Sequence, residues 1–221
     1  MEQLSGSVVP LVLLGLLPFV LLATTSFAKL SIVFSVLRNA LGTGQVPSGM
    51  VVTVLSAILT AYVMAPVARE MATASAPYAP RIDLRTPFAG DSGKALAEVF
   101  DHGKEPLRRF LEHNAGRGEV ALFFDLAKRA QPEAKTQDLT DKDLHIVLPA
   151  FFITELKEAF EIAFLLLVPF LVIDLVVASI LAALGMQALA PAAVALPFKL
   201  LLFVSIDGFR ALIEALVAGY R

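Results

Sequence analysis

The sequence predicts an all-α membrane protein in which a polar helical insert separates two pairs of hydrophobic helices. Of its 221 residues, 57% are hydrophobic, whereas soluble domains usually contain about 45–50%. Residues 3–28, 39–68 and 175–198 carry no charge, and each run exceeds the roughly 20 residues that cross a bilayer as a helix. By contrast, 25 of the 38 charged residues lie between Arg69 and Asp143, which places the polar insert in the middle of the chain.

The composition also excludes several kinds of function. The chain has no Cys, so it cannot form a disulfide, a thiolate metal site or a cysteine nucleophile. A net charge of -2 is too small to suggest a nucleic-acid partner. The three histidines lie in the insert without metal-ligand spacing, and no nucleophile elbow or phosphate-binding loop is present: His102, His113 and His145. We therefore expect a protein that is not an enzyme and holds no metal or cofactor.

The first hydrophobic pair begins with a broken segment, about residues 8–28, which is interrupted by Pro10, Gly15 and Pro18. Proline inside a helix removes a hydrogen bond and bends the axis. The next helix carries two cations and ends in the turn "GTGQVPSG", after which the second apolar run continues to about residue 68.

The two cations of that first pair, Lys29 and Arg38, suggest an orientation. By the positive-inside rule their side of the membrane is cytoplasmic, which puts the insert on the periplasmic side. The residues "SFA" at 26–28 resemble a signal-peptide cleavage site, but the early residues carry no positive charge. We therefore expect no cleavage there.

The insert, about residues 72–148, predicts short surface helices between irregular segments. The proline-rich stretch "ASAPYAPRIDLRTPF" is expected to be extended, and the polar stretch "QPEAKTQDLTDKD" is expected to be a linker. Two amphipathic stretches, about residues 94–113 and 118–130, predict helices with one apolar side. We interpret the charged cluster "DHGKEPLRRFLEH" as a solvated helical face rather than a docking surface.

The second pair predicts a long third helix, about residues 150–184, and a fourth helix that is kinked or begins at Pro197. The third helix starts with three acids spaced three residues apart: Glu155, Glu158 and Glu161. These acids either favour an interfacial helix start or pair with other chains, and the sequence leaves both alternatives open.

Asp174 lies alone on the third helix, with 12 uncharged residues before it and 24 after it. A carboxylate in such a segment usually faces a partner or an aqueous path. If the last two helices are antiparallel and turn near Met186, Lys199 lies level with Asp174, roughly 19 Å from the turn at helical rise. The same geometry brings Glu161 level with Arg210. A neighbouring subunit is the alternative source of each partner.

Several long motifs resemble the FliP/YscR/SctR family of type III secretion export proteins. They are "TSFAKLSIVFSVLRNALGT", "YVMAPV", "PAFFITELKEAFEIAF", "VPFLVIDLVVASILAALGM" and "LPFKLLLFVSIDGF". The resemblance covers about residues 15–70 and 149–215 and does not include the insert.

This resemblance implies a non-enzymatic core subunit of the export gate in the bacterial inner membrane. The subunit would form a homo-oligomer, expected to be a pentamer, with smaller export-apparatus membrane subunits, and unfolded proteins would pass through it. It implies three parts: an N-terminal hairpin (1–71), a periplasmic insert (72–148) and a C-terminal hairpin (149–221). Flagellar members often carry a cleaved leader, for which this chain has no room, so the injectisome branch and a role in virulence are favoured.

The family's loop between the last two helices commonly carries a run of methionines that closes the pore. The same loop here reads "LGMQALAPAA", which retains one methionine, and methionine suits an irregular seal because it is flexible and unbranched. The resemblance assigns the seal to Met186, Gln187 and Leu189. In the alternative interpretation Met186 only packs.

A second hypothesis is a proton-coupled membrane carrier in which Asp174 and Glu161 relay protons. A carrier would work as a monomer or dimer, whereas a gate needs a large assembly. The mass of the detergent-extracted complex therefore distinguishes the two.

Overall fold

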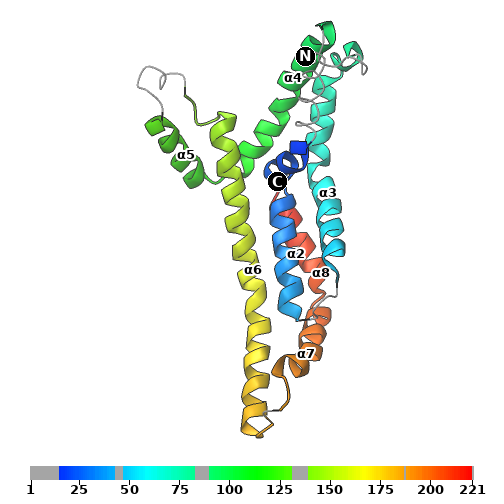
Figure 1. Ribbon diagram of the computed structural model, residues 1–221, viewed down its shortest axis with the longest axis vertical. Helices are drawn as coiled ribbons and strands as arrows, with labels where there is room; N and C mark the ends of the chain where they lie inside the picture. The colour runs from blue at the N-terminus through cyan, green and yellow to red at the C-terminus, as the bar shows by residue number, and fades with distance from the viewer. Residues whose placement is uncertain (1–14, 43–46, 83–89, 131–138, 187, 221) are drawn as a thin grey trace, which may run out of the picture. The chain divides into compact units, whose positions relative to one another are not determined.

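The computed structural model describes residues 15–42, 47–82, 90–130, 139–186 and 188–220 (Figure 1), and every regular element in these ranges is a helix. The predicted all-α class is therefore confirmed for this part of the chain. In order, the elements are Gly15–Thr24, α2 (Phe27–Leu41), α3 (Gly49–Ser75), the 3₁₀ turn η1 (Ala79–Arg81), α4 (Gly90–Asn114), α5 (Arg117–Ala130), α6 (Leu144–Ala183), α7 (Pro191–Ser205) and α8 (Gly208–Ala218).

Contacts within the chain define two compact units. The first unit comprises Met64–Glu155 together with the residues up to Ser26, and the second comprises Phe27–Val63 and Leu156–Arg221. Helices α3 and α6 each continue from one unit into the other. They also run through residues 71 and 148, where the sequence predicted the insert to begin and end.

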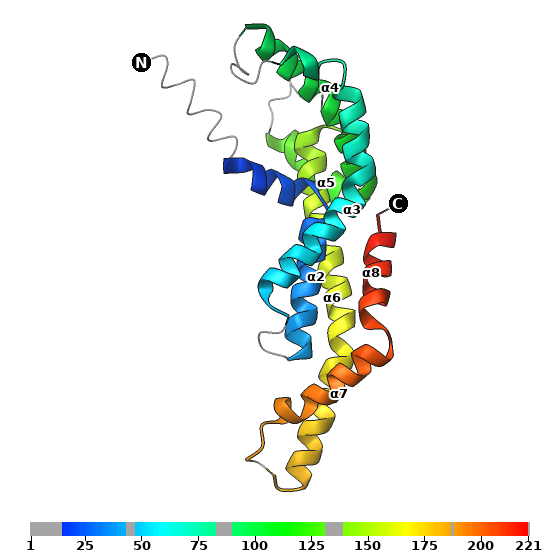
Figure 2. The same cartoon turned by 90° about the vertical axis from the view of Figure 1, so that its right-hand side faces the viewer.

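The core of the second unit forms around α2. Apolar residues recur in α2 at the three- and four-residue intervals that share one helix face, and all of them are buried: Leu30, Val33, Phe34, Leu37 and Leu41. Phe170 of α6, Phe203 of α7 and Leu216 of α8 belong to the same cluster. Figures 1 and 2 both show α2 lying beside α6 and α8.

The end of the second unit differs from the predicted single fourth helix. Pro197 lies inside α7, and the chain breaks instead at Ile206 and Asp207, between α7 and α8. Asp207 has a left-handed backbone, with φ of 49°, and Asp is one of the few residues with a side chain that tolerates this region. Pro191 occupies the start of α7, where its fixed φ favours helix initiation.

The first unit has a smaller core, in which Leu111 of α4 meets Val147 and Phe151 of α6. The stretch that was expected to be extended contains the end of α3, a turn and the 3₁₀ helix η1, so that expectation is wrong for residues 74–81. Tyr78 precedes this turn, and its ring stacks on His102 of α4 with 4.5 Å between the ring centroids. This contact with α4 holds the segment in a compact turn. Residues 83–89 and 131–138 lie outside the described ranges.

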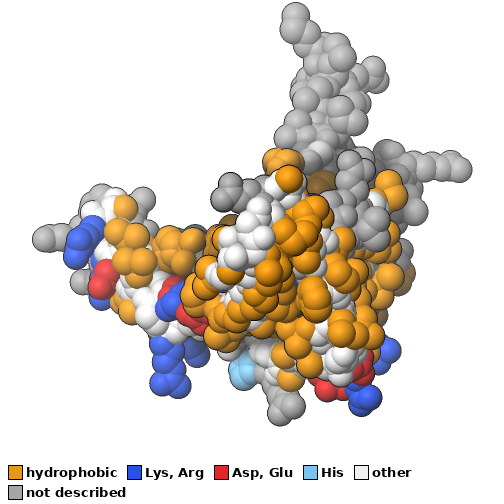
Figure 3. Space-filling model, turned by 90° about the horizontal axis from the view of Figure 1, so that it is seen from below, with side chains coloured by type: hydrophobic (Ala, Val, Ile, Leu, Met, Phe, Trp, Pro, Cys, Tyr) orange, Lys and Arg blue, Asp and Glu red, His pale blue; other side chains and the backbone are white. Residues whose placement is uncertain are grey.

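Two described helices, α3 and α6, are long and apolar enough to cross a membrane. The bent pair formed by Gly15–Thr24 and α2 would make a third span if it crosses as one element. Only 17% of the apolar window in α3 and in α6 is buried within the chain. Figure 3 shows hydrophobic side chains gathered over one face of the molecule. These surfaces are therefore left for lipid or for other chains to cover.

Candidate functional site

A buried lysine joins three helices of the second unit. Lys199 Nζ on α7 lies 2.6 Å from Asp174 Oδ2 on α6 and 3.0 Å from the backbone oxygen of Ala40 on α2. Only 7% of the Lys199 side chain is exposed. Ala40 is in the last turn of α2, where carbonyl groups lack partners within the helix. The ammonium group therefore neutralises the Asp174 carboxylate and also caps the C-terminus of α2.

The Asp174 carboxylate is less enclosed than the lysine. Its side chain is 38% exposed, although the second oxygen, Oδ1, is buried and has no hydrogen-bond partner among the described residues. The sequence predicted that Asp174 and Lys199 lie level with each other along the antiparallel helices. It left open whether the partner of each side chain comes from this chain or from a neighbouring subunit. Within this chain the two side chains are in contact.

A second buried lysine, Lys29 of α2, forms another ion pair of this unit. Its Nζ lies 2.6 Å from Glu158 Oε2 on α6 and 4.1 Å from the centroid of the Tyr220 ring. The Lys29 side chain is 3% exposed and that of Glu158 is 46% exposed. The sequence reasoning used Lys29 only to orient the chain and missed this contact. The available signal was that Lys29 directly follows a run of 26 uncharged residues.

The remaining acids of α6 have different surroundings. Glu155 is fully buried, whereas Glu161 is exposed and lines a groove with Val36 and Phe164. In the described part of the chain no ion pair joins Glu161 to Arg210. Arg210 Nε instead donates to Glu214, one turn along α8, at 2.8 Å. The ion pair predicted between Glu161 and Arg210 is therefore not formed within the described chain, and Arg210 lies beyond the break between α7 and α8.

The loop between α6 and α7 begins with a glycine-dependent helix end. Gly185 has φ of +71°; its N–H donates to Ala182 O, and the N–H of Met186 donates to Leu181 O. This pair of bonds is the Schellman motif, which turns the chain sharply away from the helix. Met186 and Leu189 are 44% and 45% exposed. Gln187, the third residue assigned to the seal, lies outside the described residues.

Beside this loop, α6 and α7 pack through Val177, Leu181 and Ala195. An apolar cavity of about 370 Å³ lies along the two helices and is lined by side chains such as Val176, Ile180 and Phe198.

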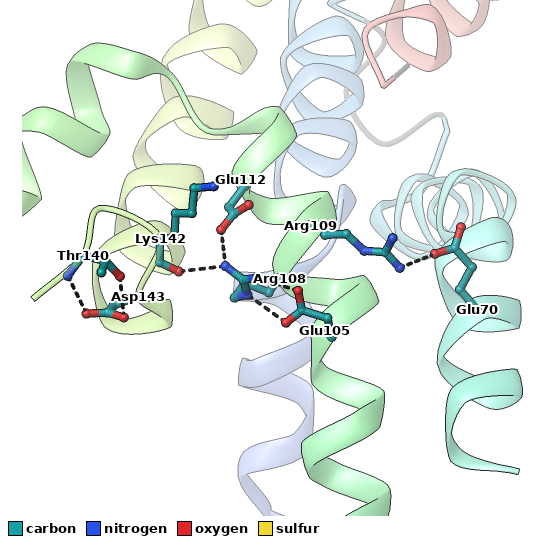
Figure 4. A network of polar contacts seen from close by, with 8 residues as sticks. All are labelled: Glu70, Glu105, Arg108, Arg109, Glu112, Thr140, Lys142 and Asp143. Atoms are coloured by element: carbon teal, nitrogen blue, oxygen red, sulfur yellow. Dashed lines mark hydrogen bonds and ion pairs between the residues drawn. The ribbon is translucent and has the colours of Figure 1, made fainter. Parts of the chain in front are cut away.

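A charged network in the first unit holds α4 against the start of α6 (Figure 4). Arg108 Nε donates to Glu105 at 2.9 Å, and Arg108 Nη1 donates to Glu112 and to the backbone oxygen of Lys142. Arg109 pairs with Glu70 of α3 at 2.9 Å. The cluster that the sequence suggested to be a solvated face thus also makes contacts within the chain.

The electrostatics of this network follow from its hydrogen bonds. The hydrogen bond from Arg108 lowers the pKa of Glu105, and the carboxylate in turn raises the pKa of Arg108. Asp143, which immediately precedes α6, accepts hydrogen bonds from the Thr140 backbone N–H at 3.1 Å and from its hydroxyl at 2.9 Å. These two bonds lower the pKa of Asp143, because they favour its ionised form.

The sequence model of the FliP family matches residues 10–216. The chain belongs to the FliP family. The Yop proteins translocation protein R of Yersinia pestis is 42% identical over 213 residues, which cover 96% of this chain and 94% of the relative. The hypersensitivity response secretion protein HrcR of Ralstonia nicotianae is 40% identical over 219 residues, or 99% and 98% of the two chains.

A flagellar relative is similar over the same length. The flagellar biosynthetic protein FliP of Bacillus subtilis is 36% identical over 222 residues, which cover 99% of this chain and 94% of the relative. The FliP-family resemblance of the sequence motifs is therefore confirmed. The FliP family consists of non-enzymatic membrane proteins of the type III secretion and flagellar export apparatus.

Proposed function

We propose that this FliP-family chain is a core subunit of a type III secretion export gate in the bacterial inner membrane. In this role it forms a homo-oligomer, a pentamer, with smaller membrane subunits of the same apparatus, and unfolded proteins pass through the assembly. The observation that carries the proposal is the full-length similarity to secretion proteins, together with the largely exposed apolar surface of α6. The names of these two relatives favour the injectisome branch.

The contacts of the second unit support this role. The pairs Lys199–Asp174 and Lys29–Glu158 fasten α2, α6 and α7 to one another. The helices can then act as two hairpins whose outer apolar faces meet neighbouring subunits. The exposed side chains of Met186 and Leu189 stand at the turn of the second hairpin, where they and Gln187 would form the seal. Glu161, which is exposed, is the candidate for a contact between subunits, whereas Glu155 is buried within the chain.

The proposed orientation places the insert in the periplasm. Its support is the sequence pattern, in which Lys29 and Arg38 follow a run of 26 uncharged residues and the positive-inside rule assigns such cations to the cytoplasmic side; both cations lie on α2. Periplasmic reporter domains fused at Gly90 and at Gly116 should both be active, and cytoplasmic reporters at the same positions should be inactive. Cytoplasmic activity at both positions would show that the proposed orientation is wrong.

The mass of the assembly tests the gate itself. The full chain would be expressed with the rest of its secretion apparatus, extracted in mild detergent and measured by native mass spectrometry. A gate subunit should appear as a multiple of the 23.7 kDa chain with several copies, and removal of its gene should abolish secretion of apparatus substrates. A monomer or dimer would instead favour the proton-coupled carrier, in which Asp174 and Glu161 would relay protons.

A further inference from the structure

Helix α5 in the first unit has two apolar faces that point in different directions. Val120, Ala121 and Phe124 line a groove between α5 and its neighbours. Leu122 and Leu126 are 53% and 47% exposed. Each of these leucines lies two residues from Phe124, about 200° around a helix with 3.6 residues per turn. The leucine strip, Leu122 and Leu126, is therefore on the opposite side of α5 from the groove.

The groove combines an apolar lining with charges of both signs. Its volume is about 670 Å³. Ala115 and Val147 extend the apolar lining that α5 provides. Four charged side chains complete it: Glu112, Arg117, Asp141 and Lys142. An occupant that fits this groove needs an apolar ridge with an acid and a base beside it.

The leucine strip has this chemistry. Leu122 and Leu126 lie one helical turn apart and form a ridge. Asp125 and Arg129 are exposed on the same helix, and Arg129 follows Leu126 by three residues. Across a contact between two copies, Asp125 can pair with Lys142 or Arg117 of the groove. Arg129 can pair with Asp141 or Glu112 of the groove. Both halves of a complementary contact are therefore present on this one chain.

We propose that the leucine strip of one copy docks into the α5 groove of a second copy of this chain. The proposal rests on the proposed homo-oligomer and deepens it by naming a surface of the insert that joins neighbouring subunits. The leucine strip and the groove lie on opposite sides of α5. Each copy can therefore insert its strip into the groove of one neighbour while its own groove binds the strip of another. Contacts of this head-to-tail kind close into a ring when the rotation between copies permits.

Cysteine cross-linking tests this contact cleanly, since the native chain contains no Cys. One tagged copy would carry Leu126→Cys and a differently tagged copy Ala121→Cys, both as full-length chains with the rest of the apparatus. Mild oxidation should give a disulfide-linked pair that contains both tags. Leu126→Cys alone should give no linked pair, because a head-to-tail contact does not bring the strip against itself.

The matched control is Phe100→Cys, which replaces an exposed apolar residue of α4 (67% exposed) outside the leucine strip. Its mixture with Ala121→Cys should give no linked pair. In a second arm, Leu122→Asp should remove the link between Leu126→Cys and Ala121→Cys, whereas Phe100→Asp should leave it. Unfolding midpoints of the two aspartate variants, measured in detergent, should match the parent because both side chains are exposed.

Native mass measurement of the same samples separates this proposal from the proposed function. If the parent is a homo-oligomer but Leu126→Cys links only to itself, to Phe100→Cys, to another protein or to nothing, the docking contact is wrong and the gate subunit stands. If the parent has no homo-oligomer, both proposals fail. A link specific to Leu126→Cys with Ala121→Cys, lost in Leu122→Asp, supports the docking contact.

Discussion

Lys199 Nζ on α7 lies 2.6 Å from Asp174 Oδ2 on α6 and donates a second hydrogen bond to Ala40 at the end of α2. A buried ammonium group is costly unless a counter-ion and hydrogen-bond acceptors surround it. Here one amine has both kinds of partner, and each comes from a different helix. The contact therefore makes the arrangement of α2, α6 and α7 depend on one side chain.

Lys199→Ala and Asp174→Ala should each destabilise the chain. Breaking a buried pair by removing one member typically costs about 3–5 kcal/mol, and we expect the lower end because the Asp174 side chain is 38% exposed. Combining Asp174→Lys with Lys199→Asp should recover only part of the loss, since an aspartate cannot donate to Ala40 O. Denaturant unfolding in detergent and the yield of assembled complex would measure the effect.

The control for this exchange is Arg210→Ala, which removes the exposed pair with Glu214 and should cost less than about 1 kcal/mol. An exchange variant that is no more stable than either single variant would show that the Asp174–Lys199 contact is not important for stability.

The Lys29–Glu158 pair should respond asymmetrically to substitution. Glu158→Gln leaves a buried ammonium, 3% exposed, without this carboxylate, whereas Lys29→Met leaves a carboxylate that is 46% exposed and can be hydrated. Glu158→Gln should therefore lower the free energy of unfolding more than Lys29→Met. Chemical unfolding of the two variants side by side measures the difference, and equal or reversed losses would contradict the burial argument.

Gly185→Ala should weaken the end of α6. The substitution places a side chain on a left-handed residue, which costs about 1–2 kcal/mol. Gly118→Ala is the matched control, because a Cβ there meets nothing within 4 Å and a helical position favours alanine over glycine. Thermal unfolding should show a lower midpoint only for Gly185→Ala. Gly185→Asn should fall between the two, since Asn tolerates the left-handed region.

Acidification should loosen the first turn of α6 through Asp143. Its pKa is lowered in the folded chain by the hydrogen bonds from Thr140. The stabilisation is therefore present above the carboxyl's ordinary pKa of about 3.9 and is lost as the pH falls through the lower folded value. Hydrogen exchange of the Ile146 and Val147 amides, corrected for intrinsic rates, should show more opening below about pH 4.

Asp143→Asn should remove this pH dependence by opening the turn at neutral pH as well. Asp141→Asn, which removes a neighbouring exposed carboxylate, should retain it. Identical pH profiles for the native chain and Asp143→Asn would contradict the role of the Thr140 bonds.

Replacing Met186, Gln187 and Leu189 together with glycine should make the assembled gate leak small ions, because flexible apolar side chains would no longer fill the opening. Ion flux would be measured in vesicles that contain the assembled complex. The control is Leu201→Gly, which removes an exposed apolar side chain of α7, 65% exposed, outside the loop. If the triple variant assembles and its ion flux is no higher than that of the native gate, the loop is not the seal.

Helix content and the position of long apolar segments could be predicted from the sequence because both depend on local composition. The level positions of Asp174 and Lys199 could also be derived, since equal distances from one turn imply equal heights in antiparallel helices. The break at Asp207 shows where this reasoning ends. It interrupts the helix between Lys199 and Arg210, so that counting residues at a regular helical rise no longer locates Arg210.

The Lys29–Glu158 contact could not be derived in the same way. Its members are 129 residues apart, and their meeting depends on how the α2 core packs against α6. The turn at η1 likewise depends on a tertiary contact, the stacking of Tyr78 on His102, which the proline-rich local sequence does not reveal.

Lys199, whose amine caps α2, is synthesised by the ribosome long after α2 itself. Lys199 follows Ala40 by 159 residues and Asp174 by 25, and ribosomes add about 5–20 residues per second. The end of α2 therefore waits roughly 8 to 32 s for its cap while the chain is being synthesised. During that interval the Ala40 carbonyl must be satisfied by water or by insertion machinery, so the nascent chain cannot complete its second unit before Lys199 has been synthesised.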